Sequence, residues 1–153
     1  MPEYTDTLMI PRPLNEVFAF FAKAENLEHI TPEFLRFRIA SESNQLEMKE
    51  GLLIDYRLRV HGIPMRWRSE ITEWNPPHAF TDEQRRGPYR YWVHRHTFRE
   101  IDEQHTEASD HVRYAHWGGP LVERFIVRPD IERIFSYRKQ KIRQWFDRER
   151  AAA

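Results

Sequence analysis

Two histidines lie between large aromatic residues in the segment Gly87-Pro-Tyr-Arg-Tyr-Trp-Val-His-Arg-His-Thr-Phe98. The segment predicts a β-strand, and alternate side chains of a strand share a face, so one face carries Trp92, His94, His96 and Phe98. Neutral histidine still needs hydrogen-bond partners when it is buried, so this face is unusual for a purely structural core. If it points inward, it lines a cavity that combines stacking surface with groups that transfer protons. We therefore predict a ligand pocket along this strand.

The next strand supplies a carboxylate for this face. A turn centred near Glu103 sets a register with these facing pairs: His96 with Asp110, His94 with Val112, and Trp92 with Tyr114. A carboxylate beside an imidazole fixes its tautomer and raises its basicity, so His96 and Asp110 are the candidate acid/base pair. A slip of one residue would turn all of these side chains outward.

The preceding strand is expected to add further polar groups. The turn at Arg85 to Pro88 places Gln84 near Arg90 and Asp82 near Trp92. With Tyr56 as a core or rim residue, the predicted ligand-binding set is Tyr56, Trp67, Asp82, Gln84, Arg90, Trp92, His94, Phe98, Tyr114 and Arg138.

The two histidines allow three interpretations, all of which stay open at this point. They belong to a polar network that orients a ligand, or His96 and Asp110 catalyse proton transfer in an aldol-type cyclisation or dehydration. In the third, His94, His96 and Asp110 hold a metal ion, as similar His-X-His strands do in cupin barrels. The helices expected at both ends of the chain do not fit a cupin, so we expect no metal and no cofactor.

Arg138 interrupts the apolar stripe of the C-terminal helix, where a plain core would place a hydrophobic residue. One interpretation is that its long side chain reaches the surface. The other is a cation at the cavity mouth that holds a carboxylate or phenolate through its planar guanidinium.

The elements that must position these residues follow from periodicity and turn signals. In chain order we expect a strand at Tyr4–Ile10, helices at Leu14–Lys23 and Ala24–Ile30, a strand at Phe34–Ala40, a turn at Ser41–Gln45, a hairpin of Leu52–Val60 with Ile63–Trp74, strands at Phe80–Gln84, Tyr89–Ile101 and Thr106–His116, and a long C-terminal helix. The pair His61-Gly62 suits the tight turn of the hairpin, which puts Val60 opposite Ile63 and Tyr56 opposite Trp67. Pro129 is expected to start or kink the C-terminal helix.

Composition limits the class of protein. The 153 residues fit one domain, 1–153, and the 24 basic and 24 acidic side chains give a net charge of zero, which argues against a nucleic-acid partner. No cysteine is present, so disulfides and thiolate chemistry are excluded. No stretch approaches the roughly 20 apolar residues of a membrane span, and no signal peptide is recognisable. We expect a cytoplasmic monomer or homodimer.

Several segments resemble the START/Bet v 1-like (SRPBCC) superfamily, in particular its bacterial polyketide cyclase/dehydrase and ligand-binding groups. They are Ile10-Pro-Arg-Pro-Leu-Asn-Glu-Val-Phe18, Ile71-Thr-Glu-Trp-Asn-Pro-Pro77 with Phe80, the run from Gly87 to Phe98, and Ile134-Phe-Ser-Tyr-Arg138. The resemblance implies an α+β helix-grip fold, in which a curved antiparallel sheet of about seven strands wraps a long C-terminal helix, with two short helices after the first strand. It also implies a deep cavity for lipids, hormones, polyketides or quinones.

The sequence therefore predicts a protein that binds a small hydrophobic or amphipathic molecule, with an aromatic or carbonyl-bearing part. One alternative is an aromatase/cyclase or dehydratase that uses a His–Asp pair. Another is a quinone or lipid chaperone that docks on a partner. The chaperone would expose an apolar patch at the cavity mouth, for which the candidates are Leu27, Ile30, Phe34 and Leu35.

Overall fold

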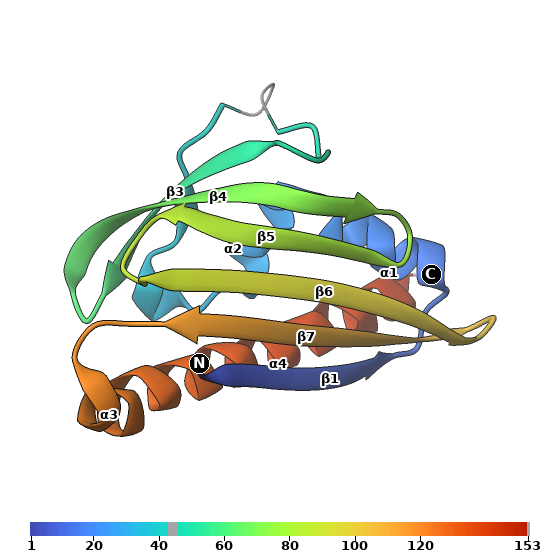
Figure 1. The fold of residues 1–153 in the computed structure, drawn as a ribbon. Coiled ribbons are helices and arrows are strands. Elements are labelled where there is room, and N and C mark those ends of the chain that lie inside the picture. The colour runs from blue at the N-terminus through green and yellow to red at the C-terminus, as the bar shows by residue number, and fades with distance from the viewer. Residues whose placement is uncertain (43–45, 153) are drawn as a thin grey trace.

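The computed structural model of the protein describes residues 1–42 and 46–152. Within these residues, seven strands form one antiparallel sheet in the order β1-β7-β6-β5-β4-β3-β2. The strands are β1 (Glu3–Ile10), β2 (Arg38–Ile39), β3 (Leu53–Val60), β4 (Ile63–Asn75), β5 (Ala79–Arg86), β6 (Tyr91–Asp102) and β7 (His105–Ala115). The sheet curves around one long helix (Figure 1), which confirms the helix-grip fold that the sequence predicts.

The helices lie together on one face of the sheet (Figure 1). They are α1 (Leu14–Phe21), the 3₁₀ turn η1 (Ala24–Asn26), α2 (Leu27–Ile30), the 3₁₀ turn η2 (Glu33–Leu35), α3 (Gly119–Val122), the π-helical segment η4 (Glu123–Val127) and α4 (Arg128–Ala152). The second short helix expected from the sequence is thus split into η1 and α2. Pro129 does not start a separate helix, because the helical backbone runs without a break from Gly119 through η4 into α4. The π-helical turns of η4 lie directly before the proline, which cannot donate a backbone N–H to the preceding turn. None of the helices within the described residues is long and apolar enough to cross a membrane.

The strand predicted at Phe34–Ala40 is wrong over most of its length. Its first residues form η2, and only Arg38 and Ile39 pair with β3. Arg36 takes a left-handed conformation with φ 46°, which breaks the extended chain between the two parts. The turn predicted at Ser41–Gln45 includes residues 43–45, which lie outside the described residues.

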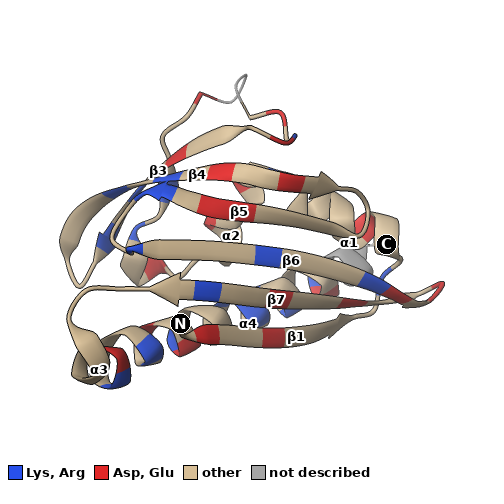
Figure 2. Cartoon of the chain, viewed as in Figure 1, with Lys and Arg blue, Asp and Glu red and all other residues tan. Residues whose placement is uncertain are grey.

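The β3–β4 hairpin has the predicted register, with Val60 opposite Ile63 and Tyr56 opposite Trp67. His61 and Gly62 both have positive φ, 50° and 79°, as a two-residue hairpin turn that follows the twist of its strands requires. One face of the hairpin turns toward the helices. The opposite face carries Asp55, Arg57, Arg66 and Arg68, which are exposed or partly exposed, as expected where an antiparallel sheet meets water. Figure 2 shows where acidic and basic residues occur along the strands.

The β6–β7 register also agrees with the prediction, and it pairs His96 with Asp110, His94 with Val112 and Trp92 with Tyr114. The β5–β6 register does not, because Asp82 faces His94 rather than Trp92. The side-chain amide of Gln84 donates to the Tyr89 carbonyl at 2.7 Å and accepts from the Tyr89 N–H at 3.1 Å. These bonds close a longer turn than expected. The shift is two residues, so every inward-facing side chain stays inward.

The apolar core between the sheet and the helices consists of three clusters. One apolar cluster joins α1 to the ends of β5 and β6, and it includes Phe18, Phe21, Phe80 and Phe98. A second lies under β3 and β4, and a third joins β7 to α4 through Val112, Tyr114, Ile131 and Phe135. Between these clusters the sheet and α4 do not close on each other, which leaves room for a cavity.

Candidate functional site

A cavity of about 430 Å³ lies between the inner face of the sheet and α4. This volume falls within the range of ligand sites in proteins, which are mostly apolar with a few polar groups that fix orientation. Its walls follow that composition, because alternate residues of the strands and one stripe of α4 point inward. The apolar lining includes Ile54, Tyr56, Leu58, Trp67, Ile71, Trp92, Ile131, Ile134 and Phe135.

The structure brings seven of the predicted site residues to the cavity wall, namely Tyr56, Trp67, Asp82, Trp92, His94, His96 and Arg138. Asp110 lies directly behind the histidines and lines a smaller void between β1, β7 and α4. The sequence did not identify the α4 residues Ile131, Ile134 and Phe135 as cavity wall, although their stripe was visible.

The other four predicted residues lie elsewhere. Phe98 packs in the core against Phe18, with ring centroids 5.4 Å apart. Tyr114 is fully buried beneath the cavity wall, and its hydroxyl donates to Glu123 at 2.5 Å. Gln84 and Arg90 lie at the β5–β6 turn, which is longer than predicted and keeps them out of the cavity wall. There Gln84 bonds to the Tyr89 backbone and Arg90 is exposed.

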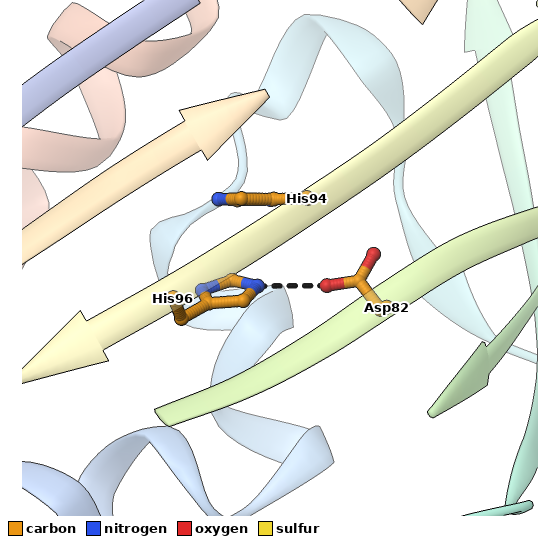
Figure 3. A group of neighbouring side chains, drawn as sticks. All are labelled: Asp82, His94 and His96. Carbon is orange, nitrogen blue, oxygen red and sulfur yellow. Dashed lines mark hydrogen bonds and ion pairs between the residues drawn. The ribbon is translucent and has the colours of Figure 1, made fainter. Parts of the chain in front are cut away.

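The histidines form a different pairing from the predicted one. His96 and Asp110 face each other across β6 and β7, but the side chain of His96 bonds to Asp82, with Nε2 2.7 Å from Oδ2 (Figure 3). The side chain of His94 bonds to Asp110, with Nε2 2.7 Å from Oδ1. Both bonds run diagonally between strands, because side chains lean along the strand direction. A carboxylate accepts only, so each Nε2 carries the proton that is donated.

The two imidazoles lie one above the other (Figure 3) and form a stack with Phe80. The ring of His96 lies 4.1 Å from that of Phe80 at 13° and 3.7 Å from that of His94 at 26°. Its Nδ1 is buried, without a hydrogen-bond partner among the described residues, and lies 3.6 Å from Asp110 Oδ1. His96 is therefore held rigidly by packing on both ring faces and by one hydrogen bond.

Arg138 does not reach the surface, so the first interpretation is wrong; it lines the cavity, and the carboxylate that it contacts belongs to the protein itself. Its side chain is 10% exposed, and Nη1 donates to Asp110 Oδ2 at 2.6 Å. Asp110 thus accepts from His94 on one oxygen and from Arg138 on the other. A helix position three turns into α4 places the guanidinium under the sheet, where this buried carboxylate compensates its charge.

Burial and the neighbouring charges set the protonation states of this cluster. Burial raises the pKa of Asp110, but the charge of Arg138 and the bond from His94 outweigh it and hold that pKa well below its usual range. Burial likewise raises the pKa of Asp82, but the hydrogen bond from His96 lowers it, and the overall shift is downward. Burial and the neighbouring His94 lower the pKa of His96 to about 4. At neutral pH both carboxylates are therefore charged and His96 is neutral.

The donor atoms of Asp82, His94 and His96 lie within 4.8 Å of one another, the spacing of a possible metal site. Their orientation does not fit one. The Nε2 atoms of the two histidines point to different carboxylates, and an imidazole lone pair lies in the plane of its ring. Two stacked rings 3.7 Å apart do not direct lone pairs to a common ion without rotating. The cluster is arranged as a hydrogen-bonded network.

The exposed residues of the cavity lining include His61 at the tip of the β3–β4 hairpin, Trp117 in the loop after β7 and Ile126 of η4, which indicates that the cavity opens between these segments. His61 at the hairpin tip bonds to Asp130 of α4, with Nε2 2.7 Å from Oδ2. The apolar patch predicted at Leu27, Ile30, Phe34 and Leu35 is wrong, because only Phe34 is exposed. The large exposed apolar side chains of this region belong to the β7–α3 loop, α3 and η4, and are Trp117, Leu121, Phe125 and Ile126.

Comparison with known proteins agrees with this architecture. The family model described as polyketide cyclase/dehydrase and lipid transport matches residues 10–139. No curated protein sequence matches the chain.

Solved structures with the same fold include protein Ms6760 from Mycobacterium smegmatis, with 18% identity, a TM-score of 0.71, and 96% of this chain and 92% of that one covered. The Zhui aromatase/cyclase from a Streptomyces species has 15% identity, a TM-score of 0.73, and coverage of 96% and 94%. The major latex-like protein 151 from Panax ginseng has 10% identity, a TM-score of 0.65, and coverage of 95% and 97%. At these identities the likeness concerns the fold.

Proposed function

Because the chain belongs to the polyketide cyclase/dehydrase and lipid transport family, we propose that it binds a small hydrophobic or amphipathic molecule between its sheet and α4. The observation that carries this proposal is the cavity of about 430 Å³, whose apolar walls enclose one polar cluster. Apolar walls remove the ligand's hydrocarbon surface from water, and a few buried polar groups fix its orientation.

The aromatic part of the wall favours a ligand with a flat or aromatic portion. Trp67 and Trp92 meet edge to face, with centroids 5.4 Å apart, and Tyr89 packs against both. Rings held in this way present flat faces at little cost in conformational entropy. Trp67 Nε1 donates to Ser69 Oγ at 2.9 Å, so its indole offers the ligand a ring rather than a donor.

Filling the cavity tests this proposal. N-phenyl-1-naphthylamine, a neutral dye that fluoresces in apolar surroundings, should bind the wild-type protein at one saturable site. Ile134→Trp places an indole in the cavity from α4 and should abolish binding. Ile101→Trp, at an exposed position on β6, is the matched control and should bind as the wild type does. Equal dye binding by all three proteins, or by none of them, would contradict the proposal.

Native mass spectrometry of the freshly purified protein complements the dye titration. A co-purified small molecule, retained by the wild type and by Ile101→Trp but absent from Ile134→Trp, would identify the ligand directly.

A second candidate function is acid/base catalysis in the same cavity, and the bond between His94 and Asp110 favours it. Asp110 orients His94 through Nε2, which leaves Nδ1 of a cavity-lining residue free to accept a proton. His96 is less suited, because a pKa lowered to about 4 makes it a weak base and stacked rings enclose it. A base at this position would suit removal of a proton beside a carbonyl, the chemistry of an aldol-type cyclisation. The solved neighbour named as an aromatase/cyclase supports testing it.

Turnover measurements separate the two candidates. If the protein is an enzyme, poly-β-ketone or enone substrates should be consumed with a bell-shaped or sigmoid pH–rate profile, and His94→Gln should lose turnover while still binding the dye. Dye binding without turnover on any of these substrates would leave binding as the function.

A further inference from the structure

The polar cluster of the cavity contains two carboxylates but one guanidinium. Arg138 is committed to Asp110, with 2.6 Å between Nη1 and Oδ2. The other carboxylate, Asp82, has no arginine or lysine within ion-pair distance in the described part of the chain. Its bonding partner is His96. Asp82 is thus a carboxylate without a direct ion pair to a fixed cation, although Arg138 acts on it from a greater distance.

The imidazole beside Asp82 does not supply the missing charge. His96 is enclosed between Phe80 and His94, and burial lowers its pKa to about 4, so it donates a hydrogen bond as a neutral ring. Burial by itself would raise the pKa of Asp82, but the bond from His96 and the neighbouring positive charge of Arg138 lower it overall, so Asp82 is a charged carboxylate that no cation contacts directly.

Asp82 lines the cavity and is also the most exposed polar group of the cluster. The Asp82 side chain is 21% exposed, against 15% for Asp110, 10% for Arg138, 9% for His94 and 5% for His96. Oδ2 accepts from His96, and Oδ1 accepts no hydrogen bond from any residue that the structure describes. A ligand in the cavity therefore meets a free carboxylate oxygen.

The walls around this oxygen suit a cation. Asp82 faces His94 on β6, and Trp92 lies two residues along on the same inward face. Trp92 and Trp67 line the cavity with the ring of Tyr56, which is paired with Trp67 across β3 and β4. The negative charge of Asp82 contributes to the raised pKa of the Tyr56 phenol, after burial, which places that hydroxyl within its electrostatic reach. Aromatic faces attract cations, and the attraction is strongest where water is excluded.

We propose that the ligand carries a protonated amine, which donates an N–H to Asp82 Oδ1 while its apolar part lies against Trp67 and Trp92. This inference rests on the proposed function, because it names the class of molecule that the same cavity takes. A carboxylate ligand is disfavoured, because Asp82 would repel it. The competing possibility is that the buried Nη2 of Arg138, which has no partner among the described residues, receives an anion.

Three ligands with one skeleton decide between these possibilities without any mutation. 4-Phenylbutylamine, 4-phenylbutanol and 4-phenylbutanoate are cationic, neutral and anionic at neutral pH, and each is titrated against bound N-phenyl-1-naphthylamine. We expect the amine to displace the dye at a concentration at least about tenfold lower than the alcohol, and the carboxylate to be the weakest. Equal potency of amine and alcohol, or strongest displacement by the carboxylate, would overturn the inference.

Failure of the dye itself to bind would be a different result, because it contradicts the proposed function. Dye binding that none of the three ligands displaces would count against the amine class alone.

Two variants locate the charge preference. Asp82→Asn keeps the shape and an acceptor for His96 and should reduce the amine's advantage over the alcohol to less than about threefold. Asp55→Asn, on the outer face of β3, is the matched control and should leave the advantage unchanged. If Asp82→Asn does not fold, Trp92→Leu replaces it, and it should weaken the amine more than the alcohol. A full amine preference in both folded variants would contradict the assignment.

Discussion

At the scale of single residues, the two histidines on the inward face of β6 each bond to one of two neighbouring carboxylates, Asp82 and Asp110. His96 faces Asp110 on one neighbouring strand and lies diagonal to Asp82 on the other, and it bonds to Asp82. His94 takes Asp110 together with Arg138. The sequence indicated which residues share this face, because a strand alternates strictly. It did not indicate which carboxylate each imidazole bonds to, because that depends on how side chains of three strands are inclined along the strand direction and on the position of Arg138 of α4.

The buried pair of Asp110 and Arg138 gives the first prediction. Asp110→Asn removes the countercharge of a guanidinium that cannot reach water, so the free energy of unfolding should fall by about 3–5 kcal/mol. Asp55→Asn breaks the exposed pair with Arg68 and should cost less than about 1 kcal/mol. Urea denaturation of both variants measures the difference. A cost of Asp110→Asn no larger than that of Asp55→Asn would show that the buried charges are compensated in another way.

His96 gives the second prediction, through its pKa of about 4 in the folded protein against 6.5 for an unperturbed histidine. Between these values the unfolded chain binds a proton that the folded protein does not. The free energy of unfolding should therefore be highest above pH 6.5 and fall by roughly 3 kcal/mol as the pH drops to 4.

Urea denaturation at stepped pH measures this slope. His96→Gln should flatten it, and the control His78→Gln, at an exposed position between β4 and β5, should keep it. A wild-type slope that is flat over this range, or an NMR titration of His96 near 6.5, would contradict the prediction.

At the scale of elements, α4 supplies both the core and the polar end of the cavity. Ile131, Phe135, Ile142 and Phe146 on its inner stripe are buried, and Arg138 interrupts that stripe beside Asp110. The stripe was predictable from the spacing of apolar residues, and so was the hairpin turn at His61-Gly62. The length of the turn between β5 and β6 was not predictable. It depends on the hydrogen bonds between the side-chain amide of Gln84 and the backbone of Tyr89, which the spacing of apolar residues does not indicate.

The packing of α4 gives the third prediction. Ile142 is 3% exposed in the cluster that joins α1 to the sheet, so Ile142→Ala should lower the free energy of unfolding by about 2–5 kcal/mol. Leu121 on α3 is 71% exposed, and Leu121→Ala should change it by no more than about 0.5 kcal/mol. Thermal and urea unfolding of both variants test this, and similar costs would mean that α4 does not hold the fold as described.

At the scale of the whole molecule, charge is spread evenly and the apolar space is concentrated. Acidic and basic residues both occur throughout the strands and helices (Figure 2), and their numbers are equal at 24 each. The buried histidines and Arg138 instead lie in one cluster beside the cavity. A molecule built in this way offers a ligand little long-range attraction, so binding should depend on what the cavity itself supplies.

Binding therefore gives a fourth prediction, for the stability of the entire fold. A ligand held between sheet and α4 binds the folded chain alone, so 4-phenylbutylamine at about 100 times its Kd should raise the free energy of unfolding by about 2.7 kcal/mol. The rise should follow the logarithm of ligand concentration and vanish in Ile134→Trp. Calorimetry at several concentrations measures it. A melting temperature that is independent of the amine, or that rises equally in Ile134→Trp, would place any binding outside the cavity.

The sequence by itself determined the fold class, the hairpin, the β6–β7 register and the inward face that carries Trp92, His94 and His96. The fold class followed from the resemblance to a known family. The hairpin, the register and the inward face follow from local rules, because strand alternation and turn chemistry act between residues close in the chain. Only the tertiary structure decided that Asp82 pairs with His96, that Arg138 lies beside Asp110, and that Phe98 and Tyr114 belong to the core. Those outcomes depend on which side chains from β5, β7 and α4 reach the same buried space, where each charge must find a partner at the lowest desolvation cost.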